Sequence, residues 1–228
     1  MKKTFTLAAI ACIFSASLVH AQVTKKQQEA FTPDKVLDAL VQGNKRFVAD
    51  NATVHDSVAR RNATTQAQHP KAVILSCLDS RVPVETVFDA GIGDLFVGRV
   101  AGNIEDSDQL GSLEFATKLA GAKLVMVLGH TECGAVRGAC NNARLGHLTG
   151  IMKKIRPSVD AVKKNTPVAD AVSSNSDFVN KVAEENVRRT IENIRHHSRI
   201  LADLEKSGQI KIVGGMYDLA SGRVSLLK

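Results

Sequence analysis

Aromatic side chains are scarce in this sequence of 228 residues, which contains no Trp, one Tyr and eight Phe. Aliphatic side chains must therefore fill the core, and a hydrophobic content of 44% is enough for the core of one domain. Proteins that bind nucleic acids usually combine a basic stripe with interleaved aromatic residues. The 30 Lys and Arg residues are scattered here, so we expect a solvated surface and no nucleic-acid partner.

Long apolar runs are missing as well, except at the N-terminus. There, residues 7–19 are mostly apolar and follow Lys2-Lys3. The run leads to Val19-His20-Ala21, which ends in a small residue and fits cleavage before Gln22. It is too short to span a bilayer comfortably. The sequence therefore predicts a signal peptide over residues 1–21.

Export of the mature chain follows from this signal peptide. Residues 22–228 are expected to form a single domain that is periplasmic and has no membrane attachment once the signal is removed. Removing the first 21 residues takes away two Lys and no acidic residue, so the formal charge falls from +7 to +5. A lipoprotein signal around Cys12 fits poorly, because Ala9-Ile10-Ala11 lacks the usual Leu and the apolar run continues beyond Cys12.

Cysteine is also infrequent, and the mature chain would keep only Cys77, Cys133 and Cys140. An odd number argues against a disulfide framework. In an oxidising compartment, Cys77 and Cys133 would be at risk of oxidation if they were free. Cys140 lies two helical turns after Cys133, where we expect a small buried helix residue. The alternative is a reactive free thiol that attacks the site around Cys77 and Cys133 on oxidation.

Short apolar runs typical of buried strands alternate with helical patterns along the chain. We expect strands over residues 71–76, 95–100, 123–128 and 210–214, and an edge strand over residues 223–227. The alternation predicts an α/β fold. In this fold a mostly parallel central β-sheet of four strands plus an edge strand is flanked by helices.

Helices are expected between these strands. Thr32 and Pro33 suit the N-cap and the first position of a helix that continues to Val48. Further helices are expected at 83–91 and 106–119, from Cys133-Gly134, as pieces within 151–172 broken at Pro157 and Pro167, and over 178–204. Residues 22–31 are expected to be loose, and residues 49–68 to be irregular.

Two short polar clusters are the most informative features of the chain. Cys77-Leu78-Asp79-Ser80-Arg81 follows one predicted strand, and His130-Thr131-Glu132-Cys133 follows another. Each cluster alone is a weak signal, but the carboxyl ends of parallel strands are where ligand sites gather in open α/β sheets. Two thiolates and one imidazole are good zinc ligands, and three protein ligands leave a fourth tetrahedral position open, as in catalytic sites.

Asp79 and Arg81 stand beside the first thiolate. An acid paired with a guanidinium at a metal site is suited to handling a proton and an anion. Together with a zinc ion that activates water, this pair indicates attack on a small electrophile.

The same residues resemble a known family. Cys-x-Asp-Ser-Arg at 77–81 followed by His-x-x-Cys-Gly at 130–134 resembles the motif of the β-class carbonic anhydrases. The likeness extends to residues 96–103 and 213–218, and it covers the chain from Pro33 to Val224.

This resemblance implies zinc-dependent reversible hydration of CO₂ to bicarbonate and a proton. It implies that Cys77, His130 and Cys133 are the Zn²⁺ ligands and that Asp79 and Arg81 form a catalytic dyad. In part of the family, the aspartate also takes the fourth zinc position in a resting form. The resemblance further implies a homodimer or tetramer in which the N-terminal helix lies over a neighbouring subunit.

Family analogy also suggests how CO₂ would be held. Val82, Phe88 and residues across the dimer interface are expected to line the apolar pocket. One departure concerns substrate orientation: many relatives carry Gln where this chain has Ala90-Gly91, so the corresponding contact is missing.

Two rival functions fit the same residues. One is a hydrolase of CS₂ or COS on the same scaffold. The other is a non-catalytic zinc protein, which the Asp79-Arg81 pair argues against because a structural site needs neither residue.

Two other patterns carry less weight. The glycines within residues 91–98 superficially suggest a dinucleotide loop, but they precede a strand instead of joining a strand to a helix. His196-His197 could ferry protons, but the pair lies beside Arg195 and Arg199. A solvated helix face is therefore the preferred interpretation.

Overall fold

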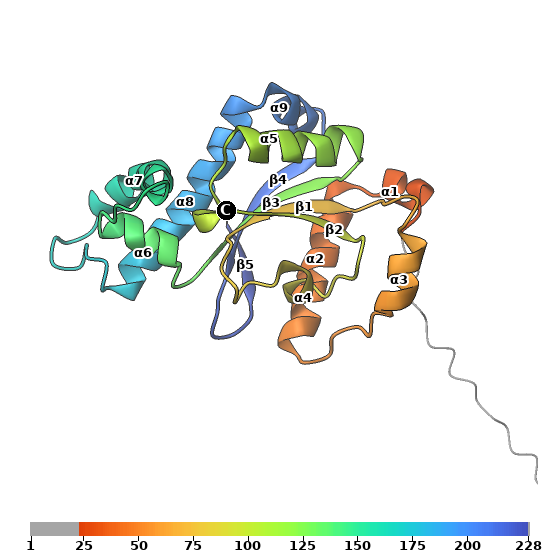
Figure 1. Ribbon diagram of the computed structural model, residues 1–228, viewed down its shortest axis with the longest axis horizontal. Helices are drawn as coiled ribbons and strands as arrows, with labels where there is room; N and C mark the ends of the chain where they lie inside the picture. The colour runs from red at the N-terminus through yellow and green to blue at the C-terminus, as the bar shows by residue number, and fades with distance from the viewer. Residues whose placement is uncertain (1–22, 228) are drawn as a thin grey trace, which may run out of the picture.

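The computed structural model describes residues 23–227, so the expected signal peptide lies outside the described residues. A five-stranded sheet forms the centre of the domain (Figure 1). Its strands are β1 (Ala72–Ser76), β2 (Leu95–Arg99), β3 (Leu124–His130), β4 (Lys211–Tyr217) and β5 (Val224–Leu227). The spatial order is β2-β1-β3-β4-β5, with the first four strands parallel and β5 antiparallel to β4. The expected fold class is confirmed.

Helices connect the strands and cover both faces of the sheet (Figure 1). They are α1 (Lys25–Ala30), α2 (Pro33–Val48), α3 (Ser57–Ala63), α4 (Val84–Val87), α5 (Ser107–Glu114), α6 (Gly134–Cys140), α7 (Leu148–Lys163), α8 (Ser176–His197) and α9 (Arg199–Lys206). A 3₁₀ turn, η1 (Ala101–Asn103), follows β2, and a π-helical turn, η2 (Phe115–Leu119), follows α5.

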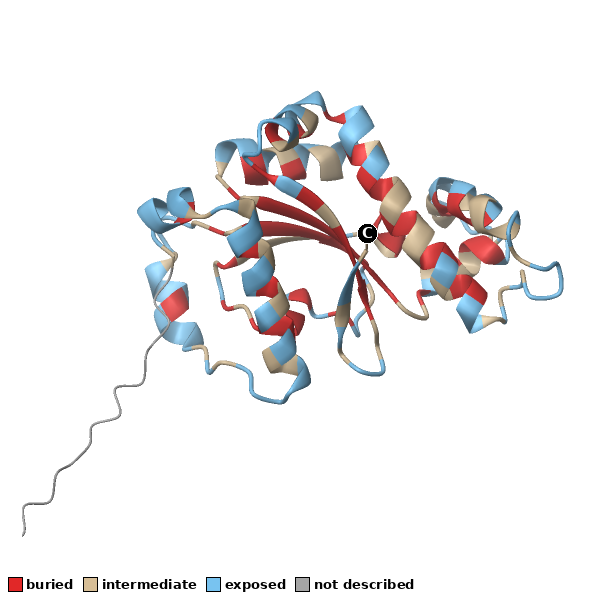
Figure 2. Ribbon diagram, turned by 180° about the vertical axis from the view of Figure 1, so that it is seen from behind, coloured by how far each residue is buried: buried red, intermediate tan, exposed pale blue. Residues whose placement is uncertain are grey.

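Side-chain alternation along the strands builds two cores. Val73 and Leu75 of β1 pack on the face covered by α5, α8 and α9, whereas Ala72 and Ile74 pack on the face covered by α2 and α4. Every residue of β1 and β3 is buried, as Figure 2 shows in red. A parallel strand buried on both faces needs an unbroken apolar run, and this is why the runs identified these strands.

Helices α6 and α7 lie beyond the carboxyl ends of the strands and pack against α8. The start of α2 confirms the expectation, because the Thr32 side chain accepts a hydrogen bond from the Lys35 N–H and Pro33 occupies the first turn.

Two segments expected to lack regular structure contain short helices. Residues 25–30 form α1 behind a capping box in which Thr24 and Gln27 bond each other. Residues 57–63 form α3 behind Asp56, whose carboxylate accepts from the Ala59 N–H. Both helices are too short to show an apolar period, so only their caps signal them.

Of the two breaks expected within residues 151–172, the one at Pro157 was wrong, whereas Pro167 does lie outside the helices. Helix α7 runs through Pro157, because packing of its buried face compensates for the missing backbone bond. The helix expected over residues 178–204 is divided at Ser198, which ends α8 and caps α9 with its hydroxyl. The apolar period continues across this residue and conceals the break.

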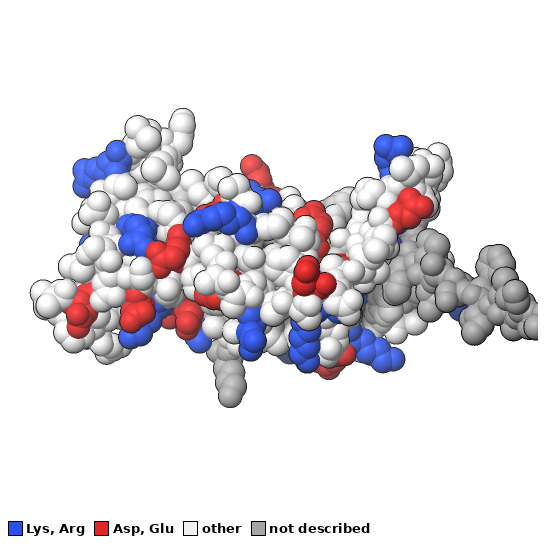
Figure 3. Space-filling model, turned by 90° about the horizontal axis from the view of Figure 1, so that it is seen from below, with Lys and Arg blue, Asp and Glu red and all other residues white. Residues whose placement is uncertain are grey.

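The surface carries charges of both signs. Acidic and basic side chains are interspersed on the face seen in Figure 3. Two ion pairs of spacing four, Glu184–Arg188 and Glu185–Arg189, lie along α8. Within residues 23–227, no helix combines the length and the apolar character that crossing a membrane requires.

Candidate metal centre

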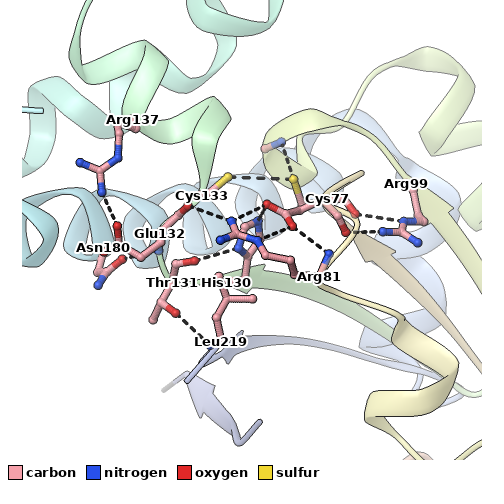
Figure 4. A network of polar contacts seen from close by, with 12 residues as sticks. Cys77, Arg81, Arg99, His130, Thr131, Glu132, Cys133, Arg137, Asn180 and Leu219 are labelled. Carbon is pink, nitrogen blue, oxygen red and sulfur yellow. Dashed lines mark hydrogen bonds and ion pairs between the residues drawn. The ribbon is translucent and has the colours of Figure 1, made fainter. Parts of the chain in front are cut away.

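The candidate ligands come together where β1 and β3 end. Cys77 directly follows β1, His130 is the last residue of the neighbouring β3, and Cys133 is the N-cap residue of α6. Their two sulfurs and the imidazole lie within 4.8 Å of one another, and all three residues are buried (Figure 4). Among residues 23–227, this is the single group of three or more His, Cys, Asp or Glu side chains with such geometry.

His130 is oriented as a ligand. Its Nδ1 lies 2.9 Å from the carbonyl oxygen of Thr131, so Nδ1 carries the proton and Nε2 presents its lone pair. The ring is fully buried, and Nε2 has no hydrogen-bond partner among the described residues. A buried acceptor without a partner is costly, and a metal ion would satisfy it. The residues present therefore fit a metal ion.

The two thiols lie 4.0 Å apart between their sulfur atoms. A hydrogen bond from the Cys133 thiol lowers the pKa of Cys77, and the Gly102 N–H, 3.4 Å from the Cys77 sulfur, lowers it further. The bond to Cys77 and burial raise the pKa of Cys133. The thiolate required of a metal ligand is thus already favoured at Cys77.

Asp79 and Arg81 form a close ion pair. Arg81 donates from Nε to Oδ1 at 2.9 Å and from Nη2 to Oδ2 at 2.8 Å, and its backbone N–H also donates to Oδ1. These bonds hold the pKa of Asp79 well below its ordinary value, so the carboxylate is ionised. Oδ2 of Asp79 lies 3.8 Å from Nε2 of His130, beside the three candidate ligands but paired with Arg81.

The comparisons with known proteins agree with this geometry. The sequence profile described as "Carbonic anhydrase" matches residues 72–224. A carbonic anhydrase of Mycolicibacterium smegmatis is 36% identical over 195 residues, which cover 82% of this chain and 90% of the relative. The chain belongs to the β-class carbonic anhydrase family. Carbonic anhydrase 2 of Mycobacterium tuberculosis is likewise 36% identical over 194 residues, covering 82% of this chain and 89% of the relative.

Solved structures show the same fold. The β-carbonic anhydrase CafA of Aspergillus fumigatus superimposes with a TM-score of 0.67 at 24% identity, covering 84% of this chain and 90% of that chain. A tetrameric β-carbonic anhydrase of Sordaria macrospora gives a TM-score of 0.68 at 22% identity, covering 85% and 97%. The resemblance inferred from the two motifs is confirmed, and this chain is a carbonic anhydrase by family.

A pocket opens beside the candidate ligands of this carbonic anhydrase. It has a volume of about 310 Å³ and is lined mainly by small and apolar residues, including Ala101, Ala135 and Met152 next to Cys77 and Asp79. Val82 and Phe88, which are expected at the CO₂ pocket together with residues across the dimer interface, do not line this pocket, and their contact with CO₂ stays a prediction. Both are buried in the core on the side of α2 and α4.

At Gly91, one of the two positions where many relatives carry Gln, this carbonic anhydrase has little room for a larger side chain. Gly91 is buried, and a Cβ atom there would lie 2.4 Å from Nε of Arg60. Arg60 of α3 forms an ion pair with Asp94, so its guanidinium is held in this space. A larger residue at position 91 would displace it.

The exposure of the side chains bears on the expectations for Cys140 and for the His196-His197 pair. Cys140 is 7% exposed within the core cluster, and burial raises the pKa of its thiol, which confirms the buried helix residue. His196 and His197 are exposed at the end of α8, opposite to the end that approaches the metal centre.

The sequence did not single out several residues around the centre. Arg99 donates from Nε to the carbonyl of Cys77 at 3.1 Å and from Nη2 to the carbonyl of Asp79 at 2.5 Å. Arg99 lies within residues 96–103, which contributed to the family resemblance, but the sequence pattern assigned no role to its side chain. Asn180, whose side chain accepts from the Glu132 N–H, gave no signal in sequence.

Proposed function

We propose that this protein catalyses the zinc-dependent reversible hydration of CO₂ to bicarbonate and a proton, and that Cys77, His130 and Cys133 hold the zinc ion. One observation carries the proposal: three buried ligand atoms within 4.8 Å of one another lie beside the ionised Asp79. A zinc ion in such a site supplies a Lewis acid that lowers the pKa of water toward neutrality.

The protein's own residues supply orientation. Asp79 accepts a hydrogen bond and aims the attacking oxygen at the carbon of CO₂, and Arg81 keeps the carboxylate ionised by its two-point pairing. The side chain of Asp79 is 17% exposed, so the released proton has a path to solvent. The mainly apolar pocket beside Cys77 suits a small apolar substrate and limits competing water.

Occupation of a fourth metal position by Asp79 in a resting form remains a separate proposal. Arg81 donates to both carboxylate oxygens, so the metal ion would have to compete with Arg81 for Asp79.

The test is stopped-flow CO₂ hydration across pH, with zinc measured on the same sample. We expect one zinc per chain and turnover that requires it. Cys133→Ser should lose the metal and the activity together, whereas Cys140→Ser should keep both. Bound zinc without CO₂ hydration would favour the hypothesis of a non-catalytic zinc protein. Hydrolysis of COS or CS₂ without CO₂ hydration would favour the hypothesis of a hydrolase of these molecules.

We also propose that the chain assembles as a homodimer or tetramer. The Sordaria macrospora structure is described as tetrameric, and Phe115 and Leu119 are exposed here at 51% and 76%. Light scattering on purified protein measures the mass, and a monomer at micromolar concentration would contradict the proposal.

The N-terminal pattern supports export to the periplasm with cleavage after Ala21. Mass spectrometry of periplasmic protein should then show an N-terminus at Gln22. A retained Met1 in exported material would refute cleavage at this site.

A further inference from the structure

Helix α8 reaches the loop that carries Cys133 and the turn η1, which contacts the sulfur of Cys77. We propose that Asn180 and Asn186 of this helix are positioning residues for the metal centre. Each forms one hydrogen bond to the backbone of a residue with positive φ. Asn180 holds Glu132, which precedes Cys133 in the chain, and Asn186 holds Gly102, which contacts the sulfur of Cys77. The inference rests on the metal site of the proposed function but not on its substrate.

Asn180 acts on the loop of Cys133. Glu132, the residue before this cysteine, has φ = 56°, a conformation that residues with a side chain rarely adopt. The Glu132 N–H donates to Oδ1 of Asn180 at 2.9 Å, and the Glu132 carboxylate pairs with Arg137 (Figure 4). The backbone turn that directs Cys133 toward Cys77 is therefore held from outside the loop.

The same turn also faces the catalytic dyad. The carbonyl oxygen of Glu132 lies 3.5 Å from Nη2 of Arg81. A change in the φ angle of Glu132 would move this carbonyl and Cys133 together. Asn180 thus supports both a thiolate ligand and the residue that pairs with Asp79.

Asn186 acts on the side chain of Cys77 through Gly102. Nδ2 of Asn186 donates to the Gly102 carbonyl at 2.8 Å, and Asn186 is only 2% exposed. Gly102 has φ = 74°, and its N–H points at the Cys77 sulfur at 3.4 Å. A Cβ at this position would meet Cδ1 of Ile155 at 2.6 Å, so glycine is required. Asn186 therefore orients the backbone N–H that contacts the Cys77 sulfur.

The two bonds have opposite polarity. A backbone N–H can only donate, so Asn180 must present its oxygen to Glu132. A backbone carbonyl can only accept, so Asn186 must present its NH₂ group to Gly102. The two residues stand six positions apart on one helix, about 9 Å along its axis, so a single rigid element holds both the loop of Cys133 and the turn η1.

Because one Asn must accept and the other must donate, the substitution Asn→Asp should have different effects at the two positions. Asn180→Asp keeps an acceptor and should bind metal within about threefold of the wild type. Asn186→Asp loses the donor and should weaken metal affinity by about tenfold or more, the usual effect of losing a group that orients a ligand. Asn180→Leu should weaken it similarly. Asn193→Asp and Asn193→Leu, on the same helix, are the matched controls, because no hydrogen bond of the Asn193 side chain is present among residues 23–227.

Zn²⁺ affinity is measured by competition with a chelator, and the Co²⁺-loaded protein is measured by its thiolate charge-transfer absorption. A residue that only stabilises the helix would lower the melting temperature and leave both readouts at control values. That outcome for Asn180→Leu and Asn186→Asp would overturn the proposal. Asn180 is only partly buried, so Asn180→Leu decides the question even if Asn186→Asp does not fold.

A rescue variant tests the role of backbone conformation. Glycine adopts positive φ without steric penalty, so Asn180→Leu should have a smaller effect on metal affinity when Glu132→Gly is also present. An undiminished effect would contradict the proposed role of Asn180. Wild-type protein that binds no metal would refute the metal site, whereas metal binding without CO₂ hydration would refute only the activity.

Discussion

At the residue scale, the ionised state of Asp79 carries the proposed chemistry. Asparagine is nearly isosteric with aspartate, but it has no negative charge and only one acceptor oxygen for Arg81, and it presents an amide donor to the reacting oxygen. We expect Asp79→Asn to retain zinc and to lose CO₂ hydration by about 10²-fold, as is usual for general acid–base groups. Stopped-flow assays of zinc-loaded protein measure the loss.

The control for this variant is Asp203→Asn, at an exposed Asp whose ion pair with Arg199 lies on the surface of α9. It should behave as the wild type. Near-wild-type turnover of zinc-loaded Asp79→Asn would show that the Asp79–Arg81 pair does not have the proposed role in CO₂ hydration.

Asp89 is a second carboxylate whose charge matters, but for stability. Its side chain is 1% exposed and accepts from Nε of Arg46 at 2.6 Å and from both the N–H and the hydroxyl of Thr53. Burial raises the pKa of Asp89, but the bonds from Thr53 and Arg46 outweigh it, and the net pKa lies below the ordinary value. The ionised carboxylate therefore fastens residues 46–53 to the segment after α4.

We expect Asp89→Asn to lower the free energy of unfolding at pH 7 by about 2 kcal/mol, the range for hydrogen bonds to a charged group. Because the folded-state pKa is depressed, the contribution is present above the unfolded-state pKa of about 3.9 and is lost as pH falls through the folded-state value. Urea unfolding of wild type and variant should therefore converge below about pH 4.

Asp160→Asn is the control for Asp89→Asn, since Asp160 pairs with Arg156 on the exposed side of α7. It should change stability by less than about 0.5 kcal/mol. A difference between Asp89→Asn and wild type that stays constant from pH 7 to pH 3 would mean that the charge of Asp89 plays no part.

At the scale of elements, α7 keeps an unfavourable residue in its interior. Pro157 is exposed, ten positions into the helix, and cannot donate to the carbonyl of Lys153. We expect Pro157→Ala to raise the free energy of unfolding by about 1–2 kcal/mol, less than the full cost of helical proline because proline also restricts the unfolded chain.

Chemical unfolding measures this gain. Pro167→Ala, in the turn after the helix, should bring no gain, because the proline there lies outside the helical ladder. An unchanged or lower stability for Pro157→Ala would show that the proline contributes a contact that alanine cannot replace.

At the scale of the whole molecule, a metal ion would join segments that lie far apart in sequence, since Cys77 and Cys133 are separated by 56 positions. A ligand that binds only the folded state stabilises it, by about 4 kcal/mol when its free concentration is a thousand times the dissociation constant. We therefore expect a chelator to lower the melting temperature of the wild type and of Cys140→Ser. Cys133→Ser should start lower and show no response, and a chelator-sensitive Cys133→Ser would refute Cys133 as a ligand.

The sequence by itself predicted the strands of the sheet and the candidate ligand set. Strands β1 and β3 were predicted because buried parallel strands require unbroken apolar runs, and parallel strands place their carboxyl ends at one edge. Cys77 and His130 were therefore expected at one edge of the sheet, and the pairing of β1 with β3 places them side by side. Helix ends were less predictable: the divide at Ser198 and the continuity of α7 through Pro157 depend on packing, which the apolar period does not record.

Tertiary structure alone decided how the centre is held. Asn180 and Asn186 bond backbone groups 48 and 84 positions away, and such bonds leave no periodicity or motif in the chain. The same holds for Arg60, which lies against Gly91 only because α3 packs there. Ligand identity is local chemistry and can be predicted from sequence, whereas ligand orientation depends on which distant side chain reaches a given peptide group, and only the folded chain settles that.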